Sequence, residues 1–330
     1  MTNNAHSDTH QQDQLTVGLA QISSVWLNKA TTIDKVCDYL GRAAAQGCEL
    51  VVFGEALVPG YPFWVELTGG ARFNADDQKQ MFAHYIRNAL DIDACDLDPV
   101  CNLAREHGLA VYLGTIERPA DRTSMSLYCS MVYIDQSGEI QSVHRKLMPT
   151  YEERLVWSPG DGHGLRTHKL GAFQVGGLNC WENWMPLARA SLYGQGENLH
   201  VAIWPGSVRN TIDITPFLAK EGRSFVLSVS GMLHVDDVPD SLPNYQAIID
   251  GASGAVDGFL ANGGSCLAAP NGDWVIEPQV GKEGLFVATV DLERVREERQ
   301  NFDPAGHYSR PDVTSLTVNR QRQSTVILKD

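Results

Sequence analysis

Apolar, β-branched runs alternate with amphipathic helical stretches from residue 15 onwards, and this alternation restricts the folds that the chain can adopt. The run LTVGLAQIS at 15–23 is typical of a buried strand. A helix is predicted over 31–46, where apolar residues fall on one face, and Gly47 supplies its stop signal. A second strand is predicted at 49–54. The chain therefore opens with a β-α-β unit.

The same alternation continues along the rest of the chain. Turn signals at Ser137-Gly138 and Asn271-Gly272 each join two apolar runs and predict strand hairpins. The segments 232–264 and 303–330 show no regular period and are predicted to be irregular. The pattern predicts further helices at 78–90, 98–107, 185–196, 216–222 and 292–302, and further strands at 109–117, 127–134, 139–146, 173–180, 199–204, 225–230 and 285–292, with a hairpin over 265–278.

Neither an internal repeat nor a shift in composition marks a domain boundary. We therefore predict one α/β domain over residues 15–310, with mixed sheet inside and helices outside. Residues 1–14 lack the apolar segment of a signal peptide and are predicted to be a disordered, solvated tail. Residues 311–330 are predicted to be a C-terminal tail at a subunit interface, because the irregular segments carry Leu, Val and Ile without a core period.

Acidic side chains dominate the charge of the chain: 26 Lys and Arg against 40 Asp and Glu give a net charge of −14. Such a surface repels phosphate backbones and anionic lipid, so we expect neither nucleic acid nor a membrane as a partner. The seven cysteines are an odd number without CxxC pairs, which predicts reduced thiols and a cytoplasmic location. Motifs for phosphate and zinc sites are missing, so we predict no metal and no nucleotide cofactor.

Three ionisable residues stand at the ends of predicted strands, where α/β sheets bind ligands: Glu55, Lys146 and Cys180. Each alone is ordinary, because a lone Cys usually packs, a lone Lys is usually exposed and a Glu after a strand often caps the next element. Together they form a complete set of carboxylate base, cation and thiol nucleophile. The backbone N–H of Trp181, directly after the nucleophile, is the expected second donor to developing negative charge.

The segments around these three residues resemble a known family. FGEALVPGYPFW, HRKLMPTYEERLVWSPGDG and GLNCWENWMPLAR are similar to the signature blocks of the nitrilase superfamily, whose members use a Glu-Lys-Cys triad. The order of the three residues and their spacings of 91 and 34 residues look like those of the family. The similarity extends from the opening strand to GHYSRPD, which begins at residue 306.

This resemblance implies a four-layer αββα sandwich, no cofactor, and hydrolysis of a non-peptide carbon–nitrogen bond. By position, Glu55, Lys146 and Cys180 inherit the roles of base, charge stabiliser and nucleophile. Subunits of the superfamily typically pair by packing helices together, and true nitrilases often extend these dimers into spirals. We therefore expect a homo-oligomer, a dimer or larger.

Glu153 matches a second glutamate of these sites, one that orients the lysine. Considered without the family, its alternative is an ion pair with Arg154 or Arg145. Aromatic residues gather after Glu55 and Cys180, and we expect them to wall an apolar substrate pocket, although at least half of them are also expected to fill the core. The pocket residues that we predict are Tyr61, Trp64, Trp184 and His307, the last with a surface or interface position as its alternative.

The block KLMPTYEERLVW, the sequence CWEN at the nucleophile and GHYSRPD are similar to the true nitrilases rather than to amidases or carbamoylases. The resemblance implies that a nitrile and water give a carboxylic acid and ammonia through a covalent cysteine thioimidate and thioester. Three alternatives stay open: an aliphatic amidase, a cyanide-hydrolysing enzyme with the same triad, and a non-catalytic assembly protein. The sequence does not distinguish an aliphatic, aromatic or arylacetonitrile substrate from cyanide.

Overall fold

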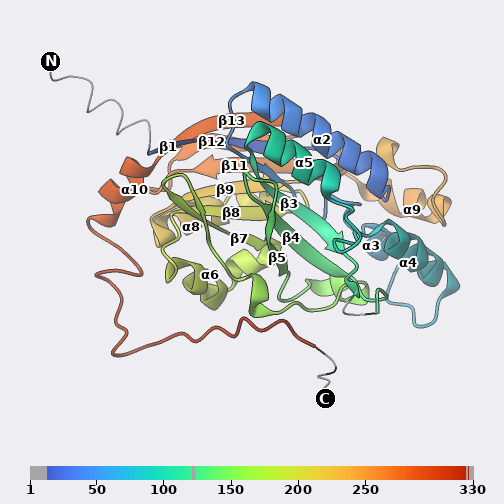
Figure 1. Ribbon diagram of the computed structural model, residues 1–330. Helices are drawn as coiled ribbons and strands as arrows, with labels where there is room; N and C mark the ends of the chain where they lie inside the picture. Colours follow the sequence, from blue (N-terminus) through green and yellow to red (C-terminus); the bar gives the residue numbers. More distant parts are fainter. Residues whose placement is uncertain (1–12, 121–122, 325, 327–330) are drawn as a thin grey trace.

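The computed structural model describes residues 13–120, 123–324 and 326, and two β-sheets form its centre (Figure 1). The tail predicted at 1–14 lies almost wholly outside the described residues, and the first strand begins at Gln14. Among the helices that the structure describes, none is both long enough and apolar enough to cross a membrane.

In the first sheet the strand order is β13-β1-β2-β3-β4-β5. β1, β2 and β3 run parallel, whereas β13, β4 and β5 pair antiparallel with their neighbours. The predicted turn joins β4 to β5, and Gly138 has the positive φ of 78° that such a turn needs. The strands are β1 (Gln14–Gln21), β2 (Leu50–Phe53), β3 (Ala110–Glu117), β4 (Tyr128–Ile134), β5 (Ile140–Arg145) and β13 (Gly284–Asp291).

In the second sheet the strand order is β10-β11-β9-β8-β7-β6, and β12 also pairs with β11. β7, β8 and β9 run parallel, and the hairpin predicted at Asn271-Gly272 joins β11 to β12. The strands are β6 (His168–Leu170), β7 (Phe173–Asn179), β8 (Leu199–Trp204), β9 (Phe225–Ser230), β10 (Met232–His234), β11 (Phe259–Ala268) and β12 (Trp274–Val280).

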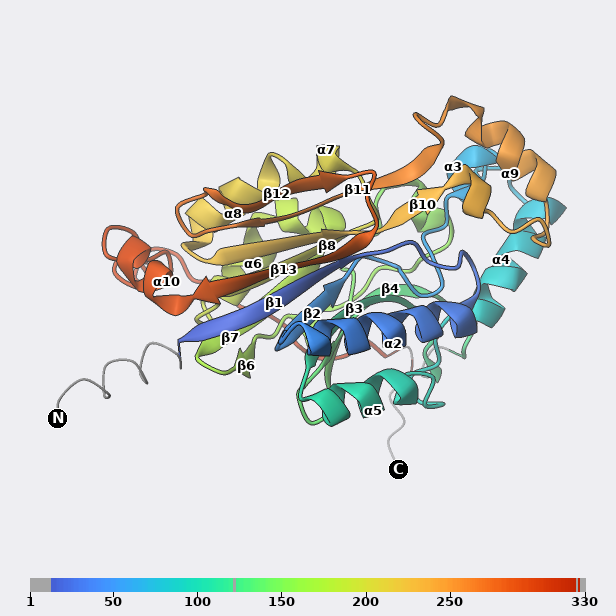
Figure 2. The same cartoon turned by 90° about the horizontal axis from the view of Figure 1, so that it is seen from above.

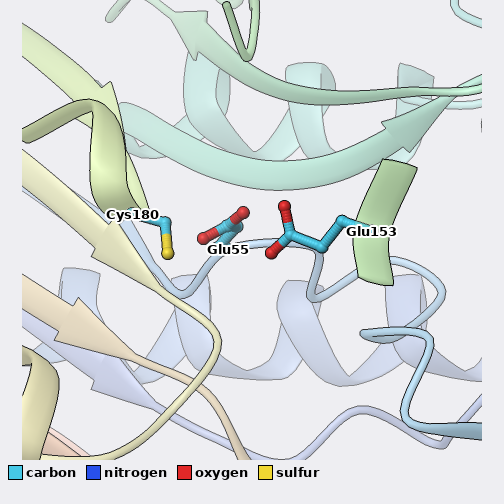
Figure 3. Close-up of side chains that lie close together, drawn as sticks. All are labelled: Glu55, Glu153 and Cys180. Atoms are coloured by element: carbon cyan, nitrogen blue, oxygen red, sulfur yellow. The ribbon is translucent and has the colours of Figure 1, made fainter. Parts of the chain in front are cut away.

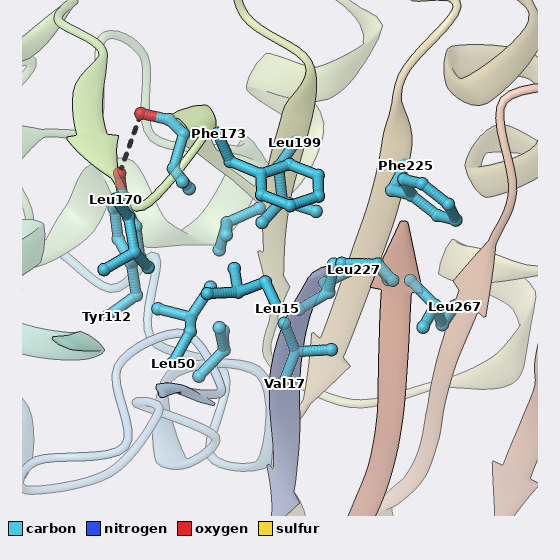
Figure 4. Close-up of a cluster of buried hydrophobic side chains, with 14 of the residues drawn as sticks. Leu15, Val17, Leu50, Tyr112, Leu170, Phe173, Leu199, Phe225, Leu227 and Leu267 are labelled. Atoms are coloured by element: carbon cyan, nitrogen blue, oxygen red, sulfur yellow. Dashed lines mark hydrogen bonds between the residues drawn. The ribbon is translucent and has the colours of Figure 1, made fainter. Parts of the chain in front are cut away.

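Side chains from both sheets meet in one apolar core between them (Figure 4). Leu15 and Val17 of β1 and Leu50 of β2 belong to the same buried cluster as Leu199 of β8 and Leu227 of β9. Helices cover the outer faces of the sheets, so the central strands are buried on both sides. This double burial explains why their sequences are continuous apolar runs rather than alternating ones.

Helices form an outer layer on each side of the stacked sheets (Figure 2). α2 (Lys29–Ala45) and α5 (Asp98–His107) cover the first sheet. α6 (Pro186–Tyr193), α7 (Val208–Thr211) and α8 (Ile214–Gly222) lie on the side of the second sheet. The layer order confirms the predicted αββα sandwich. The remaining helices are α3 (Trp64–Leu67), α4 (Asp76–Asn88) and α9 (Tyr245–Gly251), which gather at one end in Figure 2, and α10 (Leu292–Arg299).

The segment 232–264, predicted to be irregular, contains regular structure instead. It holds β10, α9 and the first half of β11. Because β10 spans three residues and α9 seven, neither is long enough to show a hydrophobic period. The segment after α10 has neither helix nor strand within its described residues, in agreement with the prediction.

Candidate active site

Glu55 follows β2 in a turn that the neighbouring strand holds closely. Its backbone N–H donates to the Trp204 carbonyl of β8 at 3.1 Å, which ties the turn to the second sheet. A side chain on Gly114 of β3 would lie 2.1 Å from the Gly54 carbonyl oxygen and 2.7 Å from the Glu55 Cα. Because position 114 is a glycine, β3 can lie this close to the turn that carries Glu55.

Lys146 follows β5, and its ammonium group is completely buried. Its backbone N–H donates to the Cys129 carbonyl of β4 at 2.7 Å, which extends the β4–β5 pairing by one residue. Nζ donates to Glu55 Oε1 and to Glu153 Oε2, both at 2.7 Å. One lysine thus links two buried carboxylates.

Glu153 lies on the 3-10 helix η2 (Tyr151–Leu155), in the segment after Lys146. Besides Lys146, it accepts hydrogen bonds from the Thr150 backbone N–H at 2.6 Å and from the Tyr61 hydroxyl at 3.0 Å. The alternative ion pairs are not formed: Arg145 pairs with Glu117 instead, and Arg154 donates to a backbone carbonyl. The structure therefore places Glu153 on the lysine.

Cys180 is the first residue of the 3-10 helix η4 (Cys180–Trp184), immediately after β7. Its backbone has a left-handed φ of 47° and its side chain is buried. The Cys180 sulfur and carboxylate oxygens of Glu55 and Glu153 all lie within 4.8 Å of one another (Figure 3). Because Cys180 and Trp181 open η4, their N–H groups have no acceptor within that helix.

Burial and charge together set the protonation of this cluster. Burial raises the pKa of Glu55 to about 7, against the opposing effect of Lys146. Burial alone would lower the pKa of Lys146, but Cys180 and the two carboxylates raise it well above its usual range. Burial and the charge of Glu55 also raise the pKa of the Cys180 thiol. The resting thiol is therefore protonated, and it needs a base to become a nucleophile.

Glu55, Glu153 and Cys180 have the donor atoms of a metal site, but Lys146 already bonds both carboxylates. Its ammonium group supplies the positive charge that a cation would bring. The donor set therefore fits an organic substrate better than a bound metal.

Two residues of the cluster were missed by sequence reasoning. Cys129 Sγ donates to Glu55 Oε1 at 3.2 Å. It lies opposite Lys146 because Ser130 pairs with Arg145 across the β4–β5 hairpin. The register shifts at a bulge between Tyr133 and Ile134, so the predicted turn at Ser137-Gly138 did not indicate this pairing.

Glu182 is the second missed residue. It accepts from the Asn179 N–H at 2.8 Å and the Leu147 N–H at 2.6 Å, and its other partner is His144 Nε2 at 3.0 Å. The sequence does contain a pattern that indicates this role: Asn179 is followed three residues later by Glu182, as in the capping box at the start of a helix. Glu182 joins the nucleophile turn to the segment that carries Lys146.

The four predicted pocket residues lie in different surroundings. Tyr61 reaches the cluster through Glu153, and it lines a small cavity of about 10 Å³ beside Glu55, with Phe63 among the other lining residues. Trp64 is completely buried and packs edge-on against Tyr85. Trp184 is about half exposed, and His307 is exposed with its ring against Tyr308. The structure thus brings Tyr61, of these four, to the carboxylates.

Comparisons with known proteins agree with this architecture. Residues 16–300 match the family model of the carbon–nitrogen hydrolases. An aliphatic nitrilase from Rhodococcus rhodochrous is 33% identical over 94% of this chain and 84% of its own. Nitrilase 2 from Arabidopsis thaliana is 32% identical over 93% of this chain and 89% of its own.

A solved structure adds support for the fold. The carbon–nitrogen hydrolase from Helicobacter pylori superposes with a TM-score of 0.66 at 18% identity, over 91% of this chain and 96% of that chain. The family model, the relatives and the stacked sheets lead to one conclusion. The chain belongs to the carbon–nitrogen hydrolase family, on its nitrilase branch.

Proposed function

We propose that the protein hydrolyses an organic nitrile to the carboxylic acid and ammonia, with Cys180 as nucleophile. The observation that carries this proposal is the buried cluster in which Lys146 bonds both Glu55 and Glu153 beside the Cys180 thiol. Relatives named as nitrilases, at 32–33% identity over more than nine-tenths of the chain, support a nitrile as the substrate.

In the first step Glu55 takes the proton of the Cys180 thiol while the sulfur attacks the nitrile carbon. A carbon–sulfur bond forms, one π bond of the nitrile opens, and its electron pair moves to nitrogen. We assign stabilisation of that charge to Lys146 and to the N–H of Trp181. The proton held by Glu55 passes to the nitrogen, which leaves a neutral thioimidate.

Two waters complete the reaction. The first adds to the thioimidate carbon with Glu55 as base, and the tetrahedral intermediate expels ammonia to leave a thioester. The second releases the carboxylic acid and restores the thiol of Cys180. The sum is one nitrile and two waters giving one acid and one ammonia. A carboxyl whose pKa is about 7 suits this alternation between base and acid.

The charge and space of the site favour a small, uncharged nitrile. An ionised cluster of Glu55, Glu153 and Lys146 is net negative, so it repels a substrate that carries a carboxylate near the nitrile. The cavity beside Glu55 has room for about one water molecule. A compact substituent therefore fits this side of the site better than a bulky one.

The test is ammonia release from a panel of aliphatic, aromatic and arylacetonitriles, with cyanide and the matching amides included. We expect the wild type to release ammonia from nitriles, and Cys180→Ala to lose about 10⁴-fold or more of that rate. Cys266→Ala is the matched control, because Cys266 is a buried thiol on β11 that bonds to Thr215. A Cys180→Ala variant with near wild-type rates contradicts the proposal, and activity on amides alone identifies an amidase.

We further propose that two copies of the chain pair through the outer faces of η4, α6, α7 and α8. Trp184, Leu187 and Phe217 are each about half exposed or more on these elements. An ion pair between Arg189 of α6 and Glu221 of α8 at 2.5 Å ties the two helices into one surface. Several large apolar side chains exposed on neighbouring elements are typical of a protein interface.

The C-terminal tail is proposed to extend this contact. Within the described residues, Leu316 and Val318 line a groove of about 950 Å³ beside Tyr193 of α6. Sedimentation velocity tests the pairing: the wild type should sediment as a dimer or a larger species, and Phe217→Asp should shift it towards the monomer. Val256→Asp, at an exposed valine in the connection between α9 and β11, is the matched control. A monomeric wild type would contradict the proposal.

We also propose a cytoplasmic location. All seven cysteines are unpaired, which supports a reducing compartment. Fractionation of cells that express the full chain tests this directly, and recovery of the protein outside the cytoplasmic fraction would refute it.

A further inference from the structure

Cys129 is a second thiol of the cluster, and the proposed reaction does not consume it. It lies on β4 and is 1% exposed. Its carbonyl accepts the Lys146 backbone N–H at 2.7 Å, and its Sγ donates to Glu55 Oε1 at 3.2 Å. One residue therefore contacts both the cation and the base of the proposed triad.

The two oxygens of Glu55 have different partners. Oε1 accepts from Lys146 Nζ at 2.7 Å and from Cys129 Sγ at 3.2 Å. Oε2 is buried and accepts no hydrogen bond from the residues that the structure describes. Figure 3 shows one carboxylate oxygen of Glu55 turned toward the Cys180 sulfur. With Oε1 already holding two donors, Oε2 is the oxygen left to receive a further proton.

We propose that Cys129 is a positioning residue: its thiol occupies Glu55 Oε1, and so orients Oε2 to take the proton of Cys180. The effect of Cys129 on catalysis depends on the function proposed above. In the attack step the Cys180 S–H bond breaks, the proton moves to Oε2 and the sulfur bonds to the substrate carbon. Cys129 keeps its own proton throughout.

Among the described residues, the side chains that donate to Glu55 are Lys146 and Cys129, and Cys129 is the neutral donor of the two. The other ionisable groups that interact with Glu55 are the Lys146 ammonium, the Glu153 carboxylate, the Cys180 thiol and the phenols of Tyr61 and Tyr85. Burial raises the pKa of both phenols well above their usual range, although the Tyr61 side chain is only partly buried. The Tyr61 hydroxyl donates to Glu153, and the Tyr85 hydroxyl donates to the Gly60 carbonyl.

Cys129 itself remains a donor at neutral pH. Burial, with the charge of Glu55, raises the pKa of the Cys129 thiol well above its ordinary value. A donor to Oε1 stabilises the ionised form of Glu55 and lowers the pKa of that carboxyl. Removing the donor should therefore raise the pH at which the cluster first loses a proton.

The experiment compares Cys129→Ala, Cys129→Ser and the control Cys266→Ala by the pH profile of kcat/KM on the best nitrile. In Cys129→Ala the acidic limb should move up by about half a pH unit, a threefold loss of activity on that limb. Cys129→Ser restores a donor and should return the limb to the wild-type position or below it. Cys266→Ala should leave the limb unchanged. Cys129→Val serves as a second donor-free variant if the alanine variant folds poorly.

A second readout does not depend on the substrate. The rate at which iodoacetamide alkylates Cys180, followed by mass spectrometry of its peptide, should show the same shift of the acidic limb in Cys129→Ala. If the wild type hydrolyses no nitrile, the proposed function fails, and the alkylation profile still decides the role of Cys129. An acidic limb that stays in place in both donor-free variants would overturn the proposal, even if their rates fall.

Discussion

The proposed nucleophile, Cys180, has a left-handed backbone. Cys180 has a φ of 47°, a region that glycine enters freely and that costs an L-residue about 1–2 kcal/mol. The conformation begins η4 and directs the sulfur out of β7 toward Glu55 (Figure 3). The fold therefore stores strain at the residue that we propose as the nucleophile.

This strain predicts that glycine at position 180 stabilises the protein relative to alanine, the reverse of its usual effect inside a strand. Cys180→Gly and Cys180→Ala both remove the thiol and should both lose hydrolysis. The glycine variant should have a free energy of unfolding about 1 kcal/mol higher than the alanine variant, because it removes the Cβ from a left-handed position. Urea denaturation measures the difference. At Cys266, within β11, glycine should instead be the less stable of the two, and equal stability of the Cys180 pair would contradict the argument.

Residue-level prediction from sequence succeeds where a position is marked by the end of a strand. Glu55, Lys146 and Cys180 each stand at the end of a predicted strand, so their convergence is expected from the edge of a sheet. Cys129 and Glu182 were missed for a different reason. One lies inside a strand and reaches the cluster through the hairpin register, and the other has backbone groups and a histidine as its partners.

At the scale of elements, Glu182 couples η4 to the segment after β5. Its carboxylate accepts the N–H groups of Asn179 and Leu147, one on each side of the junction, and pairs with His144. Burial would raise the pKa of Glu182, but His144 and the two backbone donors lower it below the ordinary value. One buried anion therefore links the residue before Cys180 to the residue after Lys146.

Replacing Glu182 by Gln should lower the free energy of unfolding by about 2–4 kcal/mol at pH 7, because an amide N–H then faces a donor. The folded-state pKa of Glu182 is depressed, so its contribution is present above the unfolded pKa, near 4.5, and is lost as pH falls through the folded value. The difference in free energy of unfolding between wild type and Glu182→Gln, measured by urea titration, should therefore become smaller below pH 4.5.

A surface carboxylate provides the control for this prediction. Glu298 pairs with Arg223 at 2.8 Å with both side chains partly exposed, so Glu298→Gln should cost less than about 1 kcal/mol. A Glu182→Gln variant as stable as Glu298→Gln at pH 7 would show that the carboxylate does not hold the two elements together.

Helices and strands were predicted best from sequence where they are long and deeply buried. The central strands β2, β3, β8 and β9 are buried along their whole length and appear as largely apolar runs. The helix predicted over 98–107 is α5 with the same bounds, and a left-handed Gly108 ends it. α2 begins two residues earlier than predicted, because the Asn28 side chain accepts the Thr31 N–H at 3.2 Å. The three-residue β10 and the seven-residue α9 carry too few turns or pleats for any period to show.

At the scale of the whole molecule, the site exists because two sheets are stacked. Glu55 and Lys146 follow strands of the first sheet, while Cys180 follows a strand of the second. Neither sheet alone holds Glu55, Lys146 and Cys180, so the apolar core between the sheets is also what assembles the cluster. Local sequence patterns predict the strands of each sheet. That the two sheets stack on each other was predicted by the family resemblance and not by hydrophobic periodicity.

The net charge of −14 leads to a final prediction about pairing of the whole chain. Two copies that meet through the apolar face of α6 and α8 bring together surfaces that repel each other. Salt screens this repulsion, since the Debye length falls from about 30 Å at 10 mM to about 8 Å at 150 mM salt. The dimer dissociation constant should therefore fall by about tenfold over this range, as measured by sedimentation equilibrium. Phe217→Asp should stay dissociated at both concentrations, because its defect is the lost apolar contact. A dimer that weakens as salt rises would instead show that ion pairs hold the two copies together.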